Sequence, residues 1–335
     1  MSTQLAAAGI TDPDLAAAYQ ECRRLNAEHG TTYYLATLLL PPAKRPFVHA
    51  LYGFARFADE IVDAPAADGV AGRRVRLDAL RRDFESAWHS GHSEVPVVAA
   101  VLDTARRWEI GYDTFEAFLD SMALDLTVTS YETWADLQTY IYGSAAVIGL
   151  QMLPILEPSD PQRARAGAMA LGEAFQLANF IRDVAEDLDR GRIYLPLAEL
   201  RQFGVTPQWL QRRVVDADVR AALAFQVAHV RRLSDDAEHS IELLHPATRD
   251  CIATARELYC GIADQVEAID YQVFDERARV PRRRRAAVAA RAWRQARAAR
   301  RRYGSGRVTA DATAVDRSGG GPAAPDPPST ATPTA

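Results

Sequence analysis

The stretch from Gln176 to Pro196 constrains the fold most, because it carries two helical patterns at once. Apolar residues recur along it, and just before it, at the three- and four-residue intervals of an amphipathic helix: Leu171, Ala174, Ala178, Ile181, Ala185 and Leu188. A second set has the same spacing and is polar: Gln176, Asn179, Asp183 and Asp187. The sequence therefore predicts a helix with one apolar face and another face that bears an amide pair and two carboxylates.

Two interpretations fit this acidic face. Carboxylates one turn apart repel each other by about a few tenths of a kcal/mol in water, and by more when they are desolvated. The face is therefore either exposed to solvent, on a helix that the chain leaves in a tight turn at Gly191, or it holds a positive group between the carboxylates. An Asp-x-x-x-Asp spacing arises often by chance, so this stretch alone leaves both interpretations open.

Residues 51 to 63 repeat the design. Tyr52, Arg56, Asp59 and Asp63 are spaced by four, three and four residues, so they share one helix face among apolar neighbours. Two such helices facing each other would bring four carboxylates to one cavity. Oxygen ligands suit hard divalent cations, and Mg²⁺ bridges one or two carboxylates to substrate phosphates. The two faces together predict a Mg²⁺–diphosphate site inside a helical bundle.

Such a site is suited to ionisation chemistry. A metal-bound diphosphate is a good leaving group, and an apolar cavity protects the carbocation that an allylic substrate leaves behind. Three arginines near the acidic faces are suited to clamp phosphates: Arg56, Arg182 and Arg192. Three tyrosines could bind diphosphate or face a cation, although each also fits an ordinary core position: Tyr52, Tyr140 and Tyr194.

The remainder of the chain predicts an all-α fold, because no segment alternates strictly between apolar and polar residues. The residues from His29 to Tyr34 are predicted to break the helical pattern, since Gly30 and the β-branched and aromatic residues after it disfavour a helix. The expected helices are 15–27, one opened by Pro41-Pro42 and ended by Ala64-Pro65, 71–88, 95–108, one from Gly111, 132–154, the central helix, a short one near 207–212, 217–243 and 246–273.

Composition narrows the function classes. A net charge of −5 gives no strong field for nucleic acid, and nucleotide-fold, zinc-protease and serine-hydrolase motifs are absent from the sequence. Cys22, Cys251 and Cys260 lack metal or redox spacing, which is typical of the reducing cytosol. The N-terminus has no signal-peptide pattern, and the longest apolar-leaning segment, 145–156, is too interrupted to suggest a membrane span. We expect a cytoplasmic protein.

The C-terminal part changes character. From Arg277 to Arg302 the chain has twelve arginines and no acidic residue, with Trp293 as its only large aromatic. This pattern fits a solvated terminal helix or a peripheral contact with the inner face of a membrane. From Gly304 the composition is typical of disorder. The predicted organisation is a helical domain over 1–278, an Arg-rich helix over 279–303 and a disordered tail over 304–335.

The two acidic stretches resemble the motifs of the squalene/phytoene synthase family. LYGFARFADEIVD resembles the first motif and QLANFIRDVAEDLDRGRIYLP the second, while HGTTYYLATLLLP and YIYGSAAVIGL resemble the segments before and between them. The similarity runs from about His29 to Arg285 and is greatest to bacterial members that make phytoene. It implies an isoprenoid-synthase-like helical bundle with a central cavity, and head-to-head condensation of two prenyl diphosphates through a cyclopropylcarbinyl diphosphate.

The resemblance also implies roles for individual residues. Mg²⁺, or Mn²⁺ in its place, would be bridged by Asp59, Asp63, Asp183 and Asp187, which with Arg56 and Tyr194 form the expected catalytic set. The expected substrate contacts are His29, Thr32, Tyr52, Arg56, Tyr140, Gln176, Asn179, Arg182 and Tyr194, with Tyr140 lining the cavity. The likeness to phytoene-forming members implies that no NADPH is used.

Two positions depart from the family pattern. Glu60 stands where the family usually has the second of two aspartates, and its one-residue offset should point it away from the face of Asp59 and Asp63. Gly30-Thr31-Thr32 replaces a segment that usually carries serines and a basic residue, which puts one diphosphate contact in doubt. Two alternatives stay open: a C15-using enzyme that makes squalene, dehydrosqualene or presqualene diphosphate, and a non-catalytic, membrane-associated helical assembly protein.

Overall fold

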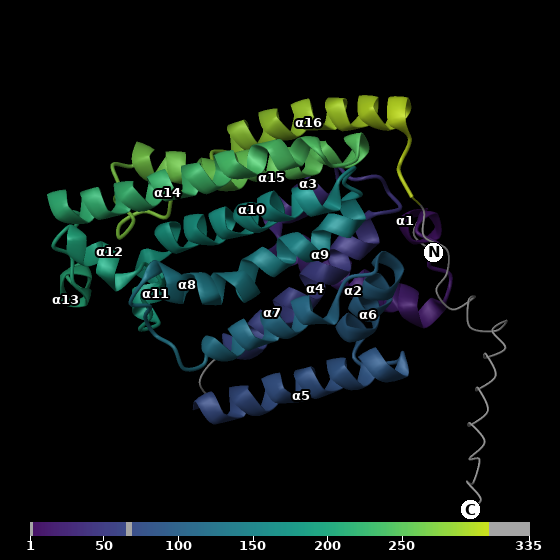
Figure 1. Ribbon diagram of the computed structural model, residues 1–335, viewed down its shortest axis with the longest axis horizontal. Coiled ribbons are helices and arrows are strands. Elements are labelled where there is room, and N and C mark those ends of the chain that lie inside the picture. The colour runs from purple at the N-terminus through teal and green to yellow at the C-terminus, as the bar shows by residue number, and fades with distance from the viewer. Residues whose placement is uncertain (1–2, 65–68, 308–335) are drawn as a thin grey trace, which may run out of the picture.

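The computed structural model describes residues 3–64 and 69–307, and every regular element of this part of the chain is a helix (Figure 1). An isolated bridge joins Ser130 to Ile193. The predicted all-α fold is therefore confirmed. The elements are α1 (Thr3–Ala7), α2 (Pro13–His29), α3 (Thr31–Thr37), α4 (Arg45–Val62), α5 (Gly69–Ser90), α6 (Pro96–Trp108), α7 (Tyr112–Leu124), α8 (Trp134–Ile141), the π-helix η2 (Tyr142–Ala146), α9 (Val147–Leu156), α10 (Pro161–Arg182), α11 (Val184–Asp189), α12 (Leu197–Gln202), α13 (Pro207–Leu210), α14 (Ala217–Glu242), α15 (Pro246–Ala268) and α16 (Arg282–Tyr303).

Helix α10 lies at the centre of the bundle. It packs against α14 and α15 on one side and against α9 and η2 on another. Helices α14, α15 and α16 form the upper layer in Figure 1, and α5 and α7 lie at the opposite edge, with α4 behind them. The apolar faces of these helices meet in the interior, so the polar face of α10 is directed at the space between α10 and α4.

Helix α4 begins later than the sequence predicts. Pro41 to Lys44 form a turn, in which the Lys44 amide donates to the Pro41 carbonyl at 2.9 Å. The Lys44 side chain is fully buried and donates to the carbonyl of Ile155 and to Glu157, each at 2.6 Å. A buried ammonium is stable only with such partners, and its anchoring directs the chain into α4.

The predicted break between His29 and Tyr34 is wrong except at Gly30. Helix α2 continues to His29 and α3 begins at Thr31, because α3 packs against α15 and this tertiary contact outweighs the weak helix propensity of its residues. Gly30 is needed for close approach: a Cβ there would lie 2.2 Å from Asn26 Oδ1. Helix α3 is thus a packed part of the bundle.

The central helix is interrupted at its first aspartate. Asp183 has φ −101° and ψ 12°, so α10 ends at Arg182 and the short helix α11 follows. Asp183 still donates its amide to the Asn179 carbonyl at 2.8 Å. The chain then turns at Gly191, whose φ of 73° favours glycine. The interruption places Asp183 at the junction of α10 and α11.

The helix expected over 132–154 contains a π-turn. Helices α8, η2 and α9 follow one another without a loop from Trp134 to Leu156. The expectation that no segment is long and apolar enough to span a membrane is wrong here. By length and composition alone, these 23 residues could cross a membrane, because their mean hydropathy reaches 1.4 in an 18-residue window. Of that window, 61% is buried in the bundle, which accounts for its apolar composition.

The Arg-rich segment forms α16, which lies along α15 (Figure 1). Val288, Ala292 and Ala296 are its buried residues. Beyond it, the backbone amide of Arg307 donates to both carboxylate oxygens of Glu157, at 2.9 and 3.1 Å. The rest of the tail predicted to be disordered, from residue 308, lies outside the described residues.

Candidate active site

The polar face of α4 opens into two adjoining spaces. Tyr52, Arg56 and Asp59 line a long apolar cavity, and Asp63, one turn later, lines a smaller polar pocket. The apolar neighbours on α4 face the core, where the Phe54 ring lies 5.2 Å from that of Phe84. This packing fixes the rotation of α4 and thereby directs its polar face.

The apolar cavity has a volume of about 380 Å³ and a polar end. The polar end is formed by His29, Tyr52, Arg56, Asp59, Gln176 and Asn179. The opposite end is apolar and includes Leu156, Ala164, Leu244, Cys251 and Ile252. From Asn179 to Ala164 the lining follows α10 for fifteen residues, which is about 22 Å at the rise of an α-helix.

Small residues give the cavity its shape. Gly149, Ala168 and Gly172 all line it. A Cβ at Gly149 would lie 2.2 Å from the Ala168 carbonyl, and one at Gly172 would lie 2.5 Å from the Ala145 carbonyl. The helices around the cavity therefore pack backbone to backbone, so the glycines serve helix packing as well as the cavity wall.

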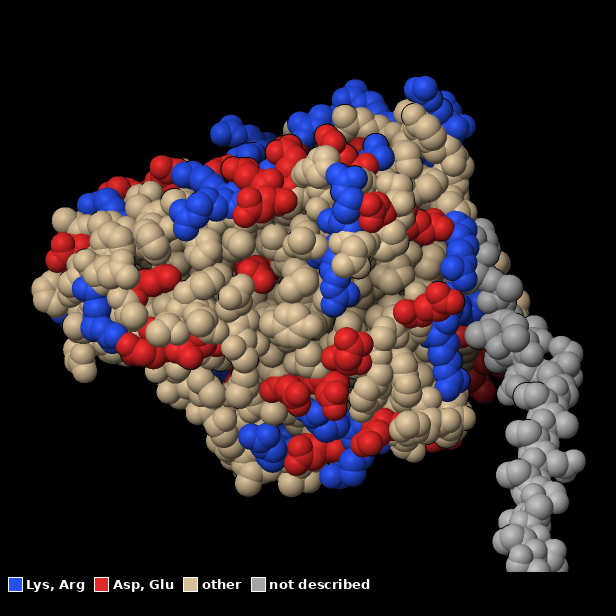
Figure 2. Space-filling model, in the orientation of Figure 1, with Lys and Arg blue, Asp and Glu red and all other residues tan. Residues whose placement is uncertain are grey.

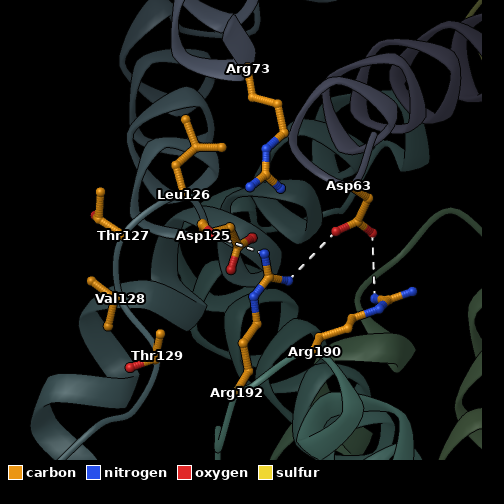
Figure 3. A pocket seen from close by; sticks show the side chains of 9 residues that line it. All are labelled: Asp63, Arg73, Asp125, Leu126, Thr127, Val128, Thr129, Arg190 and Arg192. Carbon is orange, nitrogen blue, oxygen red and sulfur yellow. Dashed lines mark hydrogen bonds and ion pairs between the residues drawn. The ribbon is translucent and has the colours of Figure 1, made fainter. Parts of the chain in front are cut away.

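The polar pocket has a volume of about 350 Å³ and lies beside Asp63 (Figure 3). Arg190 and Arg192 reach Asp63 at 3.6 and 3.5 Å. These ion pairs connect the end of the first acidic stretch to the C-terminal part of the second. The full lining is Asp63, Arg73, Asp125, Leu126, Thr127, Val128, Thr129, Arg190 and Arg192.

Two of the four predicted aspartates, the half-buried Asp59 and the buried Asp187, have no ion-pair partner among the described residues. Burial, and then the neighbouring Asp63, raise the pKa of Asp59 to about 7. Burial, and then Asp183, raise the pKa of Asp187 to about 7. A carboxylate in such surroundings gains stability when a cation neutralises it.

The other two aspartates are paired with arginines. Asp63 has Arg190 and Arg192, as described above. Asp183 accepts from Arg182 Nε at 2.7 Å and from Arg277 Nε at 2.9 Å. Arg277 also lies 3.3 Å from Glu186. The sequence interpretation missed Arg277, because nothing in the pattern shows that the loop after α15 returns to α10.

Asp125 is a second residue that the sequence interpretation missed. It follows α7 in an apolar run and accepts hydrogen bonds from Tyr140 at 2.8 Å and Tyr194 at 3.0 Å. Burial raises the pKa of Asp125 to about 6. A lone aspartate between two leucines, Leu124 and Leu126, was the available signal, since such a residue is buried with partners or not at all.

Tyr140 differs from its expected position. It is buried, but it is absent from the lining of the apolar cavity, because its hydroxyl is held by Asp125 and its ring lies 5.6 Å from that of Tyr194. Tyr194 in turn stacks on Phe180 at 4.2 Å. These rings form a rigid wall beside the polar pocket.

The remaining predicted contacts divide into two groups. Gln176 and Asn179 line the polar end of the apolar cavity, as does His29. Thr32 lies in α3 and lines neither space. Glu60 lines neither space, but its carboxylate lies 3.1 Å from Arg56 and 3.6 Å from His29, both at the polar end of the apolar cavity.

The donors at this site fit a hard divalent cation. Asn179 Oδ1 and Ser144 Oγ are buried near the polar end and have no hydrogen-bond partner, and the aspartates add carboxylate oxygens. Within the described ranges no three His, Cys, Asp or Glu side chains form a group that could hold a metal alone. One or two carboxylates per ion, completed by water and phosphate oxygens, is the arrangement that Mg²⁺ prefers.

The raised pKa of Asp187 gives a pH-dependent prediction. An unfolded aspartate has a pKa of about 3.9, so between about pH 4 and 7 the folded chain holds a proton that the unfolded chain lacks. Stability therefore falls as the pH rises through this window and stays lower above it. Without divalent metal, we expect Asp187→Asn to exceed the wild type by about 1–2 kcal/mol at pH 8 and to match it at pH 4.

Denaturant unfolding at both pH values measures this difference. Asp189→Asn is the matched control, because Asp189 is 65% exposed and pairs with Arg213. It should show no comparable gain at pH 8. An Asp187→Asn chain that is less stable than the wild type at pH 8 would contradict the burial of an unneutralised carboxyl group.

The sequence matches a family model described as squalene/phytoene synthase over residues 26–284. It is 37% identical over 278 residues to the 15-cis-phytoene synthase of Synechococcus elongatus, covering 80% of this chain and 89% of that one. A crystal structure of a dehydrosqualene synthase in complex with ligand aligns with a TM-score of 0.77 at 26% identity, covering 85% and 98% of the two chains. A squalene synthase from Alicyclobacillus acidocaldarius aligns with a TM-score of 0.71 at 28% identity, covering 79% and 98%.

The matched region begins in α2 and ends in α16, so it contains both acidic stretches, the apolar cavity and the polar pocket. The solved structures confirm the isoprenoid-synthase-like bundle. The resemblance noted in the sequence thus extends to the fold around both spaces, and the chain belongs to the squalene/phytoene synthase family.

Proposed function

We propose that the chain is a Mg²⁺-dependent prenyltransferase of the phytoene synthase type. It condenses two molecules of geranylgeranyl diphosphate head to head, through a cyclopropylcarbinyl diphosphate, to phytoene, a precursor of carotenoids. The observation that carries this proposal is the apolar cavity, which has Asp59 at its polar end and extends about 22 Å along α10 from that end to an apolar end. The identity to a cyanobacterial phytoene synthase supports the same substrate.

The length of the cavity favours a C20 substrate. Three extended backbone bonds span at most about 3.6 Å, so the fifteen bonds of a C20 main chain span about 18 Å and the eleven of a C15 chain about 13 Å. The lining of about 22 Å accepts the longer chain with its diphosphate at the polar end. A C15 chain would leave the apolar end unfilled, and unfilled apolar volume contributes no binding.

The metal site follows from the donors described above. Mg²⁺, or Mn²⁺ in its place, would be held by Asp59, Asp63, Asp183 and Asp187. The bound ion supplies neutralisation of the charge that develops on the leaving diphosphate.

The chain's own residues bind and orient the substrate. Arg56, at the polar end of the cavity, is placed to contact the diphosphate, and so are Arg182 and Arg277, which already converge on Asp183. Aromatic rings close the cavity beside this end: Tyr33 stacks on Tyr259 at 4.4 Å. Their apolar faces exclude water from the carbocation and offer it their negative π-surfaces.

Product analysis tests the proposal. The full-length chain is supplied with C15 or C20 prenyl diphosphate and Mg²⁺, each with and without NADPH. We expect phytoene from the C20 substrate, at least about 10-fold higher kcat/KM for it than for the C15 substrate, and the same product whether or not NADPH is present.

Other outcomes identify the alternatives. A C30 hydrocarbon as the preferred product would identify the C15-using enzyme. A product two hydrogens richer with NADPH would identify a reductive, squalene-type synthase. No conversion of either substrate, with diphosphate still bound, would favour the non-catalytic assembly protein.

A peripheral membrane contact is the second part of the proposal, because the substrates and product are long hydrocarbons. Figure 2 shows basic side chains along the edge formed by α16. Arg294, Arg297 and Arg301 are exposed, opposite the buried face of α16, and have no acidic partner among the described residues. Trp293 beside them is 49% exposed. A basic helix face with an exposed tryptophan fits an anionic bilayer surface.

Part of the Arg-rich run has another role. Arg284 lies 3.6 Å from Asp264, and Arg291 pairs with Glu257, so these two arginines attach α16 to α15. Truncation of the helix would also uncover the core around Val288. Substitution of the exposed arginines is therefore the cleaner test.

We expect Arg294→Gln/Arg297→Gln/Arg301→Gln to bind anionic vesicles at least about 10-fold more weakly, since each basic residue contributes about 1 kcal/mol near such a surface. Turnover in detergent should be unchanged. Arg201→Gln/Arg213→Gln/Arg220→Gln, which removes the same charge from exposed ion pairs elsewhere, is the matched control. Equal vesicle sedimentation of both triple variants would refute the contact.

A further inference from the structure

The polar pocket beside Asp63 carries more positive charge than the acidic stretches account for. Figure 3 shows Arg190 and Arg192 entering it from one side and Arg73 from the opposite side. Three guanidinium groups thus face two carboxylates, Asp63 and Asp125. Arg190 and Arg192 share Asp63, which leaves the pocket with an excess of positive charge.

Arg73 is the unexplained member of this group. It comes from α5, outside both acidic stretches, and its Nη1 donates to the Val62 carbonyl at 2.8 Å, at the end of α4. Its Nε is buried and has no hydrogen-bond partner. No carboxylate of the described residues lies within ion-pair distance of it. A buried, unpartnered guanidinium donor is costly unless an anion satisfies it.

Asp125 does not cancel this excess fully. Its two carboxylate oxygens accept from the hydroxyls of Tyr140 and Tyr194, and its backbone carbonyl accepts from Arg192 Nη2 at 2.8 Å. Burial raises the pKa of Asp125 to about 6, while Arg192 and the two tyrosine hydroxyls act in the opposite direction and favour the carboxylate. Even with both carboxylates ionised, the three guanidinium groups leave the pocket with positive charge in excess, so it favours an anion.

The lining of the polar pocket offers little apolar surface to a hydrocarbon chain. Leu126 and Val128 are the apolar side chains of the pocket, and its lining shares no residue with that of the apolar cavity. Asp63 and Asp59 nevertheless lie one turn apart on α4, so the two spaces adjoin. Thr127 and Thr129 add hydroxyl groups to the lining. A compact polyanion that leaves the polar end of the cavity fits this position.

We infer that the polar pocket is a diphosphate-binding site and that Arg73 is one of its binding residues, together with Arg190. This inference rests on the proposed function, in which each condensation releases diphosphate. When the C–O bond to the prenyl group breaks, the electron pair stays on the diphosphate, which then carries one more negative charge than the ester did. The three guanidinium groups of the pocket stabilise that charge better than they stabilise the ester, so they draw the leaving group away from the carbocation.

Direct binding of inorganic diphosphate tests the inference without turnover. Calorimetric titration of the full-length chain with diphosphate and Mg²⁺ compares the wild type with Arg73→Gln. A charge-assisted hydrogen bond contributes about 1.5–3 kcal/mol, so we expect affinity to fall at least about 10-fold. Gln keeps a donor for the Val62 carbonyl. Arg82→Gln, an exposed site on the same helix α5, is the matched control and should bind as the wild type does.

A second titration, with a non-hydrolysable C20 thiodiphosphate, separates the two sources of the diphosphate group. Weakened binding of inorganic diphosphate alone means that the pocket receives the released product. Weakened binding of both ligands means that it also holds the diphosphate end of a prenyl substrate. Both results support the site. They can be interpreted even if the chain uses C15 substrates, because inorganic diphosphate carries no prenyl chain.

Unchanged diphosphate affinity in Arg73→Gln would overturn the assignment of Arg73. Should Arg73→Gln unfold the end of α4, Arg190→Gln carries the test, because its side chain is 55% exposed and its loss leaves α4 intact. Unchanged affinity in Arg190→Gln, or an equal loss in Arg82→Gln, would overturn the site itself.

Discussion

Replacement of Asp183 by asparagine lowers turnover at saturating Mg²⁺ by at least about 100-fold, the effect of removing one preorganised electrostatic contact. Asp183 stands at the junction of α10 and α11, where Arg182 and Arg277 converge on it. The substitution removes a charge that we propose holds the metal, and also the anion on which both arginines converge. Steady-state kinetics of the full-length variant measure the loss, and Asp59→Asn should behave in the same way.

Asp189→Asn is the matched control for this loss, since it removes one carboxylate at an exposed position of α11, the short helix that follows Asp183. It should retain the turnover of the wild type. Circular dichroism and thermal unfolding should show that Asp183→Asn keeps its helices. Near-normal turnover of Asp183→Asn at saturating Mg²⁺ would refute the assignment of the metal site.

Replacement of Cys251 by phenylalanine shifts the chain-length preference from C20 towards C15 by at least about 10-fold in the ratio of kcat/KM values. Cys251 is buried at the apolar end of the cavity, near Leu156 and Leu244 in the lining, and its thiol is free. A ring there occupies the volume that the last isoprene unit needs. A single methylene in an apolar pocket changes discrimination by about 10- to 200-fold, so a whole ring suffices.

Competition between C15 and C20 diphosphates, followed by chromatography of the hydrocarbon products, measures the shift. Cys251→Ala enlarges the same position and should keep the C20 preference, as should Cys260→Ala, because Cys260 does not line the cavity. A C20 preference that survives Cys251→Phe would show that the tail of the substrate lies elsewhere.

The acidic stretches show how far sequence periodicity reaches. Spacings of three and four residues placed Tyr52, Arg56 and Asp59 on one face of α4, and the structure has these three side chains lining one cavity. The all-α class followed from the same periodicity, since it was present in nearly every segment and strict alternation in none.

Positions outside these patterns could not be predicted. Arg73, Asp125 and Arg277 come from α5, from the loop after α7 and from the loop after α15, and only the packing of the bundle brings them to the acidic residues. The interruption at Asp183 was also invisible, because the apolar spacing continues through it. Local periodicity reports which residues share a face, and carries no information on which remote loop closes over that face.

The sequence by itself therefore determined the helical class, the two acidic faces and the family to which the chain belongs. The tertiary structure alone decided that Asp59 and Asp63 face different spaces, that Asp63 and Asp183 are paired with arginines, and that Tyr140 binds Asp125. The physical reason is that helix geometry is set by hydrogen bonds within four residues, whereas burial and ion pairing depend on contacts between segments distant in the chain.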